Sequence, residues 1–436
     1  MSHYKPYPAY KDSGVEWLEK VPEHWEVKPL KYEADFVNGA AFKPEQWAET
    51  GTPIIRIENL NGSLSFNCFE GEMDFRYHVE KGDLLFGWSG NRGTSFGPFI
   101  WPHEGQYYLN QHIFRICNFK FDKRWFYWSL KAVTAHVEDQ AHGIIGMVHI
   151  TKGDLGSIKI ATPALAEQQA IAVHLDRETT RIDALVEKKT RFIELLREKR
   201  QALITHAVTK GLDPNAPMKD SGVEWLGDVP EHWDVSSIKS WFRTSSGGTP
   251  DTSRQEEFYT EAGGHPWIRT TDLNNGELWD CEIRITDSAM AASACSILPI
   301  NTVLVAMYGG EGTIGKFSIA RFPSAINQAL CALLPSKHFS SDFVYWYVQY
   351  YRPYWMVWAE STRKDPNISQ ELIRNAPIVR PPIAEQLKIC AVLAAETSRV
   401  DTLIEKTERS IELLKERRAA LITAAVTGQI DLQEAA

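Results

Sequence analysis

The stretch KDSGVEWLEKVPEHWEV (Lys11–Val27) occurs twice in this chain, because KDSGVEWLGDVPEHWDV follows at Lys219–Val235. When the alignment is extended without gaps to residues 11–31 and 219–239, the two copies share 15 of 21 residues. We call these two segments the opening motifs. Their separation of 208 residues is far longer than the period of a solenoid repeat, so it indicates duplication of a domain-sized unit.

A second, longer repeat follows each opening motif. Residues 163–213 align without a gap with residues 381–431, and 28 of the 51 positions are identical. The inserts between these repeats, roughly 36–160 and 240–378, share little sequence. A duplicated enzyme would be expected to repeat its active-site residues, whereas a frame that presents two recognition domains would vary its inserts. The sequence therefore predicts four segments, which are residues 1–160, 161–213, 214–380 and 381–436.

The longer repeats are predicted to be helices that pair in a coiled coil. Apolar residues lie seven apart in each copy, at Leu175, Ile182, Leu196 and Leu203 in the first and at Leu393, Val400, Leu414 and Leu421 in the second. About 40 helical residues would span about 60 Å, and so long a helix rarely stands alone in water. The simplest partner for each helix is the other copy, in an antiparallel pair with pseudo-twofold symmetry. The alternative is a general dimerisation coil.

The opening motifs each carry a Val-Pro-Glu-His-Trp sequence, at residues 21–25 and 229–233. Its Glu-His pair permits acid–base chemistry. A cluster of proline, tryptophan and apolar residues more often packs the start of a chain against its own domain. We therefore interpret the opening motif as a structural latch.

Both inserts are predicted to be rich in β-strands. Short apolar runs end in Gly/Asn turns within residues 53–62, 81–93, 265–276 and 301–320. Each insert also contains an aromatic, helix-like stretch, at 122–133 and 341–358, whose rings are expected in the core. The predicted fold class is therefore α+β, with two β-rich recognition domains separated by an antiparallel coiled coil.

The sequence carries no catalytic motif that we could identify. Residues 310–316 match the first seven positions of a P-loop, but Phe317 replaces the Ser or Thr that holds magnesium, and a strand is predicted to follow. The six cysteines are scattered without a C-x-x-C motif, which indicates reduced thiols in a cytoplasmic protein. We expect no signal peptide, membrane span, metal site or bound cofactor in this chain.

Several motifs together resemble the specificity (S) subunit of type I restriction–modification enzymes, the HsdS family. They are the opening motif, GGTP at 247–250, PWIRTTDL at 266–273 and PPIAEQLKI at 381–389. The first copy has PIIRIENL at 53–60, NQH at 110–112 and AEQQAI at 166–171, and the second copy has Asn327 and Gln328 at the matching place. The resemblance covers essentially the whole chain.

That resemblance implies a non-catalytic, sequence-specific DNA-binding subunit. Each of its two target recognition domains would read one half of a split, asymmetric site, and the paired helices would set the distance between the halves. The expected partners are double-stranded DNA, two modification subunits that methylate adenine with S-adenosylmethionine, and two restriction subunits that use ATP and Mg²⁺ to cleave DNA. One alternative is an enzyme, a nuclease or methyltransferase fused to its own reader, which would need a catalytic motif. The other is a scaffold that does not bind DNA and presents two other binding domains.

Charge is the feature that fits this interpretation least. The formal net charge of the chain is −9, and the inserts are nearly neutral, with 12 basic and 13 acidic residues in 36–160 and 12 and 14 in 240–380. Because phosphate contacts require Lys and Arg, we expect modest DNA affinity from this chain alone.

Arginine favours guanine, and Asn or Gln favours adenine, in direct contacts with base edges. On that basis the candidate base-contacting residues are Arg56, Asn59, Asn91, Arg92, Gln111, His112, Arg269, Thr271, Asn274, Tyr308, Arg363 and Lys364. For any one of them, a solvated loop residue is an alternative interpretation. For Asn110 and Asn327, a side chain that satisfies a turn is an equal alternative.

Overall fold

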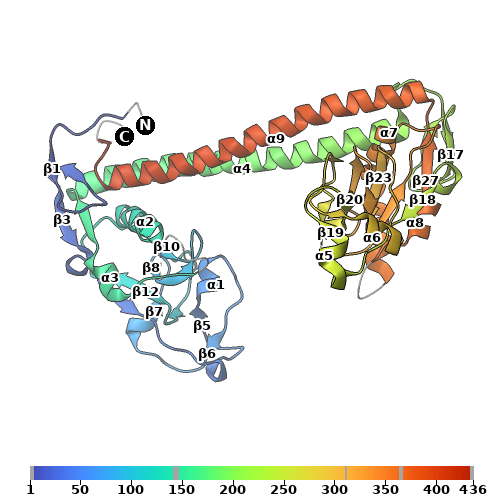
Figure 1. Cartoon of the computed structure of the whole chain (residues 1–436). Helices are drawn as coiled ribbons and strands as arrows, with labels where there is room; N and C mark the ends of the chain where they lie inside the picture. Colours follow the sequence, from blue (N-terminus) through green and yellow to red (C-terminus); the bar gives the residue numbers. More distant parts are fainter. Residues whose placement is uncertain (1–3, 141–146, 310–311, 363–366, 433–436) are drawn as a thin grey trace. The chain divides into compact units, whose positions relative to one another are not determined.

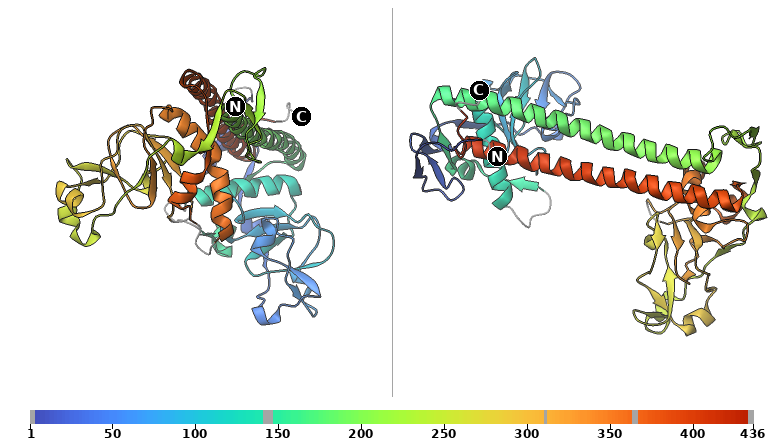
Figure 2. Two further views of the ribbon diagram at one scale, coloured as in Figure 1. Left: turned by 90° about the vertical axis from the view of Figure 1, so that its right-hand side faces the viewer. Right: turned by 90° about the horizontal axis from the view of Figure 1, so that it is seen from above.

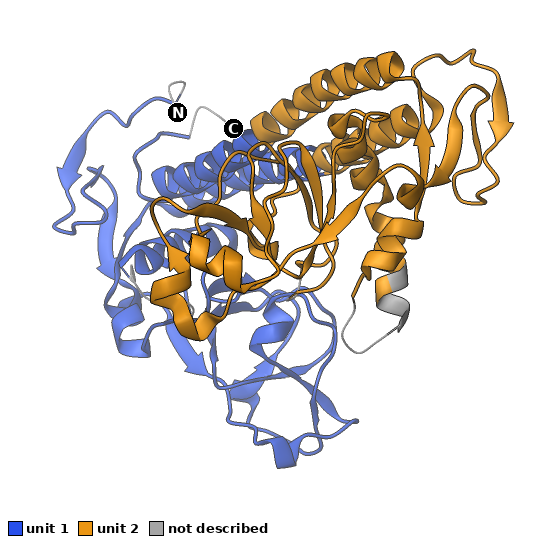
Figure 3. Cartoon of the chain, turned by 45° about the vertical axis from the view of Figure 1, so that its right-hand side comes forward, with its two compact units in different colours: residues 1–190, 408–436 blue, residues 191–407 orange. Residues whose placement is uncertain are grey.

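The computed structural model describes residues 4–140, 147–309, 312–362 and 367–432. The chain forms two compact units (Figure 3). Unit 1 comprises residues 1–190 and 408–436, and unit 2 comprises residues 191–407. Each unit therefore contains one opening motif, one insert and a part of both long helices.

The two long repeats form the helices α4 (Leu165–Lys210) and α9 (Ile383–Val426), of 46 and 44 residues. Within each unit they lie side by side and run antiparallel (Figures 1 and 2). The predicted seam is confirmed at Leu175, Ile182, Leu196, Leu393, Val400 and Leu421, which are all buried, while Leu203 and Leu414 are half-buried. The antiparallel pairing of the two copies is thus the packing that the heptad pattern predicts.

A second stripe of residues seven apart lies beside this seam, and two arginines interrupt it: Arg200 stands between Ile193 and Ala207, and Arg418 between Ile411 and Ala425. In unit 1, Nε of Arg418 lies 2.9 Å from Oδ1 of Asp183 on the facing helix. In unit 2, Nε of Arg200 lies 2.9 Å from Oδ1 of Asp401. The two ion pairs correspond to each other at the offset of 218 residues that relates the long repeats. The sequence repeat is therefore also a repeat of interhelical contacts.

The opening motif is fastened to the first turn of a long helix in each unit. In unit 1, the buried carboxylate of Glu167 accepts hydrogen bonds from the hydroxyl of Tyr7 (2.6 Å) and Nε1 of Trp25 (3.1 Å). Nε2 of His24 lies 3.1 Å from the same carboxylate. In unit 2, Glu385 takes the equivalent place.

Glu385 lies 2.9 Å from Nε2 of His232 and accepts a hydrogen bond from Nε1 of Trp233 at 3.1 Å. Trp25 and Trp233 are both fully buried, so the latch interpretation is confirmed. The partner of each histidine is a glutamate on the helix, and not the neighbouring glutamate in the motif.

Unit 1 contains two four-stranded sheets, with strand orders β10-β8-β12-β4 and β6-β5-β11-β7. Their strands are β4 (Asp35–Asn38), β5 (Thr52–Ile55), β6 (Cys68–Phe69), β7 (His78–Val79), β8 (Leu84–Gly87), β10 (Gly97–Ile100), β11 (Tyr107–Leu109) and β12 (Ile113–Cys117). The smaller ladders pair β1 (Tyr10–Asp12) with β2 (Lys20–Pro22), β3 (Glu26–Pro29) with β14 (Lys159–Thr162), and β9 (Ser89–Asn91) with β13 (Met147–His149). The helices are α1 (Ile57–Leu60), α2 (Lys123–Gln140) and α3 (Lys152–Ser157).

Unit 2 has a five-stranded sheet, β18-β26-β23-β24-β21, and a four-stranded sheet, β19-β22-β20-β25. Their strands are β18 (Thr244–Ser246), β19 (Tyr259–Thr260), β20 (His265–Ile268), β21 (Glu277–Leu278), β22 (Arg284–Ile285), β23 (Thr302–Ala306), β24 (Phe317–Ala320), β25 (Ala325–Ile326) and β26 (Leu330–Leu333). The smaller ladders pair β15 (Met218–Asp220) with β16 (Asp228–Pro230) and β17 (Asp234–Ser237) with β27 (Pro377–Arg380). The helices are α5 (Gln255–Phe258), α6 (Asp287–Ala292), α7 (Ser341–Thr362) and α8 (Gln370–Asn375).

The aromatic stretches of the inserts form α2 and α7, and their rings lie in the core as predicted. Trp125 and Phe126 of α2 are fully buried, as are Phe343 and Trp355 of α7. Phe317 begins strand β24, which confirms the strand expected after the P-loop-like segment, although Gly310 and Glu311 lie outside the described residues. No helix in the described parts of the chain is long and apolar enough to cross a membrane.

We predict that the two latches differ in strength. Glu167→Ala should lower the free energy of unfolding by about 2–4 kcal/mol, because it leaves the buried donors of Tyr7 and Trp25 without an acceptor. Glu385→Ala should cost about 1–2 kcal/mol, since the Glu385 side chain is 26% exposed, compared with 6% for Glu167. Equilibrium urea unfolding of the two variants measures both losses. Equal losses would contradict the asymmetry.

We further predict that the interhelical ion pair can be reversed. Asp183→Arg should destabilise the protein because it places two guanidinium groups in contact, and adding Arg418→Asp should restore about 0.5–1 kcal/mol. A double-mutant cycle measured by urea unfolding gives this coupling. The matched cycle at Arg200 and Asp401 should give a coupling of similar size. A coupling of zero in both cycles would show that these pairs contribute nothing to helix pairing.

Candidate nucleic-acid interface

Polar side chains gather at the carboxyl ends of a parallel strand pair in each insert. In unit 1, β5 and β11 are parallel, with Leu109 opposite Ile55, and they are followed by Arg56 and Asn110. In unit 2, β20 and β25 are parallel, with Ile326 opposite Ile268, and they are followed by Arg269 and Asn327. Because parallel strands end at the same edge of a sheet, each insert brings an arginine next to an Asn-Gln sequence.

Arg56 is held by neighbouring side chains and is partly exposed. Its Nη1 donates to Oδ1 of Asn67 (2.5 Å) and lies 3.2 Å from Oε1 of Glu58. Its guanidinium stacks over the ring of Trp47 at 4.6 Å. These contacts orient the guanidinium and leave 30% of the side chain exposed. Such an arginine is prepared for a directional contact more than for loose phosphate attraction.

Arg269 has an analogous setting in unit 2. Its Nη2 lies 3.2 Å from Oδ1 of Asp272 and 3.7 Å from Oε2 of Glu282. It lines a cleft of about 1340 Å³ together with Arg254, Tyr259 and Trp267. The carboxylates neutralise much of the arginine charge here, which agrees with the near-neutral total of the insert.

Gln111 and His112 are exposed at the end of β11. The ring of His112 packs against Trp88 with a centroid distance of 5.4 Å. Nε1 of Trp88 donates to the carbonyl of Gln111 at 2.9 Å, so the backbone of this corner is anchored while the Gln111 amide faces solvent. The ring of His149 also packs against Trp88, with a centroid distance of 5.0 Å.

Asn91 and Arg92 lie at the end of β9, which pairs with β13 and not with either strand of the parallel pair. Both are exposed. The guanidinium of Arg92 donates to the carbonyl of Glu138 on α2, and the amide of Gly93 donates to the Glu138 carboxylate (2.9 Å). Arg92 is thus held against α2, and neither residue makes a hydrogen bond to Arg56 or Gln111 in the described residues.

Two candidate asparagines use their side chains within turns. Asn59 is buried, accepts from the amide of Arg56 (2.8 Å) and donates to the carbonyls of Ser63 and Ser65. Oδ1 of Asn274 accepts from the amide of Gly276 (2.8 Å) and from the hydroxyl of Ser318 (3.1 Å). In both cases, the amide in this structure stabilises the loop that carries it.

The remaining candidates belong to unit 2. Thr271 is exposed, Tyr308 is 40% exposed, and neither side chain makes a hydrogen bond to the described residues. A Cβ atom placed on Gly309 would lie 3.6 Å from the hydroxyl of Thr270, so the segment after Met307 runs close to the turn that carries Thr271. Arg363 and Lys364 lie outside the described residues. As base contacts, all of these candidates stay predictions.

Three of the six cysteines, Cys281, Cys331 and Cys390, are not prepared to act as nucleophiles. Burial raises the pKa of Cys281 to about 11 and the pKa values of Cys331 and Cys390 to about 12. These thiols are therefore protonated at neutral pH. The described residues contain no group of three or more His, Cys, Asp or Glu side chains that could hold a metal ion.

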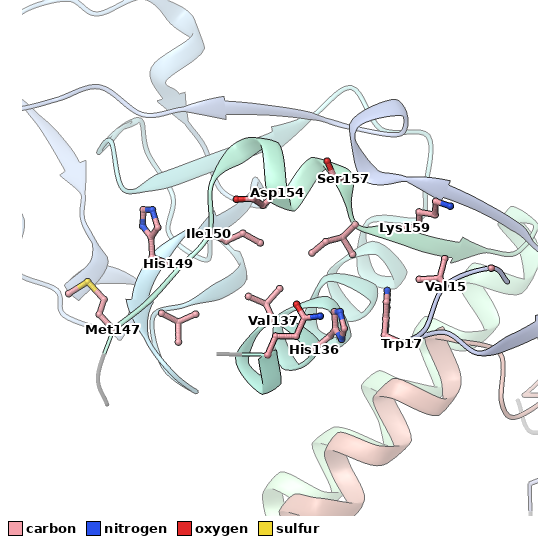
Figure 4. Close-up of a pocket in the computed structure, with 14 residues that line it drawn as sticks. Val15, Trp17, His136, Val137, Met147, His149, Ile150, Asp154, Ser157 and Lys159 are labelled. Carbon is pink, nitrogen blue, oxygen red and sulfur yellow. The ribbon is translucent and has the colours of Figure 1, made fainter. Parts of the chain in front are cut away.

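Unit 1 also contains an open cavity of about 870 Å³ (Figure 4). Trp17 of the opening motif and His136 of α2 line it, with their rings stacked at 5.1 Å. The corresponding tryptophan of unit 2, Trp225, packs closely on Tyr354, at 4.3 Å. The cavity thus lies between the opening motif and the insert, and no residue of the parallel strands β5 and β11 lines it.

Sequence reasoning missed two features of this arrangement. It did not identify Glu167 and Glu385 as the acceptors of the latch, although both follow an alanine in the repeated Ala-Glu-Gln sequence. It also left Gln328 out of the candidates, although the Asn-Gln pair at 327–328 matches the pair at 110–111. The repeated dipeptide was the available signal in the second case.

The chain matches the family model described as the type I restriction modification DNA specificity domain twice, at residues 22–195 and 230–413. It is 23% identical over 440 residues to the type I restriction enzyme EcoBI specificity subunit of Escherichia coli, which covers 97% of this chain and 90% of that protein. It is 22% identical to a putative type I restriction enzyme MjaX specificity subunit of Methanocaldococcus jannaschii, which covers 97% of each chain.

Two solved structures have a similar fold. One is a chain from a structure that addresses the complex assembly and conformational transition of the type I R-M system. Its TM-score is 0.72 at 16% identity, and the match covers 94% of this chain and 99% of that one. The HsdS subunit from Thermoanaerobacter tengcongensis gives 0.55 at 16% identity, with 94% and 98% covered. The two family matches together span most of the chain, so it belongs to the family of type I restriction–modification DNA specificity proteins, whose members recognise DNA sequence and are not catalytic.

Proposed function

We propose that each insert reads one half of a split, asymmetric DNA target and that this chain directs the catalytic subunits to it. Two modification subunits would supply S-adenosylmethionine and methylate adenine. Two restriction subunits would supply ATP-dependent cleavage with Mg²⁺. The complex would act in the cytoplasm, in keeping with six cysteines that form no disulfide framework.

One observation carries this proposal more than any other: the two inserts share a backbone pattern and differ in their exposed side chains. Both place an arginine and an Asn-Gln sequence at the end of a parallel strand pair. Around that corner, unit 1 presents an exposed His112 and a half-buried Trp88, whereas unit 2 has Ala329 and Met307 at the same positions, both buried, and so presents neither ring. A common frame with different surface chemistry is expected of two domains that read different sequences.

The long helices support a spacing role. Helix α4 is continuous over 46 residues, or about 69 Å at 1.5 Å per residue. Half-sites one turn of DNA apart are about 34 Å between centres, so a helix of this length is sufficient to link two readers. Its partner helix stiffens it in both units through the seam and the ion pairs.

The charge balance supports a division of labour in binding. The inserts are near neutrality, and Arg56 and Arg269 both lie beside carboxylates, so the inserts carry no excess of positive charge with which to attract phosphate. Most of the salt-dependent affinity would then come from the modification subunits, while this chain supplies the contacts with base edges. The same neutrality is the observation that favours the alternative of a scaffold that does not bind DNA. A scaffold predicts no sequence-specific retention of DNA even with the modification subunit present.

Exchange of one insert tests the proposal directly. When residues 240–378 are replaced by the insert of another family member, adenine methylation by the complex with the modification subunit should move to a target that differs in one half only. Methylated sites can be read by sequencing DNA from cells that express the complex. A change in both halves would rule out two independent readers. The chain without its partner should transfer no methyl group to DNA, and transfer would contradict a purely recognising role.

Helix length provides a second prediction. Inserting seven residues within 180–205 of α4, and seven at the matching positions of α9, adds about 10.5 Å to the pair. The gap between the half-sites should lengthen by about three base pairs at most, and both half-site sequences should stay the same. A four-residue substitution that keeps the length in the same region is the control. An unchanged gap in an assembled, active complex would contradict the spacing role.

A further inference from the structure

We infer that Gln328 contacts an adenine in the half-site read by the second insert, and that it does so as the structural counterpart of Gln111 in the first. This inference rests on the proposed function, because it assigns a specificity-determining residue to it. Gln328 immediately follows β25 and Asn327, as Gln111 follows β11 and Asn110.

The equivalence of the two corners rests on hydrogen bonds between backbone groups. The amide of Asn110 donates to the carbonyl of Ile55 (3.1 Å), and the amide of Asn327 donates to that of Ile268 (2.9 Å). On the other side, the amide of Ala40 donates to Leu109 (2.8 Å), and that of Gly248 donates to Ile326 (3.1 Å). The residue before each glutamine is therefore placed by the same bonds in both inserts.

The residue after each glutamine is anchored in the same way. The amide of Trp88 donates to the carbonyl of His112 (3.2 Å), and the amide of Met307 donates to that of Ala329 (2.8 Å). Trp88 and Met307 in turn accept bonds from the amides of Ile150 (3.0 Å) and Ile368 (2.7 Å), two residues that are 218 positions apart. The glutamine between these anchors thus stands on rigid backbone, which a base-reading side chain requires.

A close backbone crossing adds to this rigidity. A Cβ atom on Gly39 would lie 2.2 Å from the carbonyl oxygen of Asn110, and one on Gly247 would lie 1.7 Å from that of Ile326. Only glycine fits at either crossing. Both inserts therefore keep the same tight support under the Asn-Gln sequence, although their sequences have diverged.

The side chain of Gln328 is exposed and makes no hydrogen bond to the described residues. Gln111 is also exposed, and its amide has a single long contact, 3.4 Å to His112. The accessible amide of Gln328, at an edge that also carries Arg269, therefore has unused hydrogen-bonding capacity that a polar ligand would satisfy.

The chemistry of the side chain selects the ligand. A glutamine amide has a donor and an acceptor side by side, and these match N7 and the N6 amino group of adenine in the major groove. The glutamine side chain has no charge with which to neutralise a phosphate. A contact with phosphate would also carry no sequence information, whereas a contact with a base edge would. The competing interpretation is a solvated loop residue that contacts nothing.

The test uses the full chain together with its modification subunit. The methylated target of the wild-type complex is mapped first, and each variant is then compared with it position by position. Gln328→Ala should reduce discrimination by about 5- to 150-fold at one A·T position, in the half assigned to residues 240–378 by insert exchange. Gln111→Ala is the matched control and should act on one position of the other half only. Gln328→Glu should shift the preference at the affected position from adenine towards cytosine, because a carboxylate accepts from the cytosine amino group.

These outcomes separate the inference from the function on which it rests. If Gln328→Ala leaves every position of a wild-type split target unchanged, or if it alters both halves, the inference is wrong and the proposed function stands. If the wild-type complex methylates no split target, both are wrong. Circular dichroism and co-purification with the modification subunit would show that each variant folds and assembles. Gln328→Asn provides a second variant that keeps the amide and withdraws it by one methylene.

Discussion

The packing of each long helix against the other repeat's helix is the constraint on which the rest of the structure depends. Neither unit is formed by one continuous repeat of the sequence, because each takes part of its core from the other repeat. The core of unit 1, which surrounds Trp25 and Leu30, includes Leu421, Ala425 and Val426 from the end of α9. The core of unit 2, around Trp233, includes Ile204, Ala207 and Val208 from the end of α4. Each recognition domain is thus finished by residues of the opposite repeat.

This exchange explains why the frame is duplicated so faithfully while the inserts are not. A helix that must fit both its own opening motif and the other copy's helix is constrained on two faces. Glu167 and Glu385 hold the first contact, and the Arg–Asp pairs hold part of the second. The exposed corners of the inserts face no such demand, so their side chains are free to diverge.

The sequence predicted the frame well because its signals are periodic and repeated. The heptads and the tryptophan of the doubled opening motif concern buried positions, where packing restricts the choice of residue. The aromatic residues of α2 and α7 were correctly predicted to be buried, because packing restricts the choice of residue at those positions too. The partner of His24 was not predicted, because Glu167 lies 143 residues away and becomes a neighbour only when the helix forms.

The site was predictable only in outline. Composition and turn signals indicated which loops carry polar residues, but they could not separate Asn59, whose amide is used inside its turn, from Gln111, whose amide faces solvent. That distinction depends on hydrogen bonds between segments that are distant in sequence. The near-neutral charge was visible from the start, whereas the pairing of Arg56 and Arg269 with carboxylates required the fold.

The most direct test of the central claim is a genome-wide map of methylated adenines in cells that express this chain with its modification subunit. Two recognition domains with a common frame and different surfaces predict one methylated motif of two unlike half-sites, separated by a constant gap. A continuous motif, or two identical halves, would contradict the account. An assembled complex that produced no new methylation would do the same.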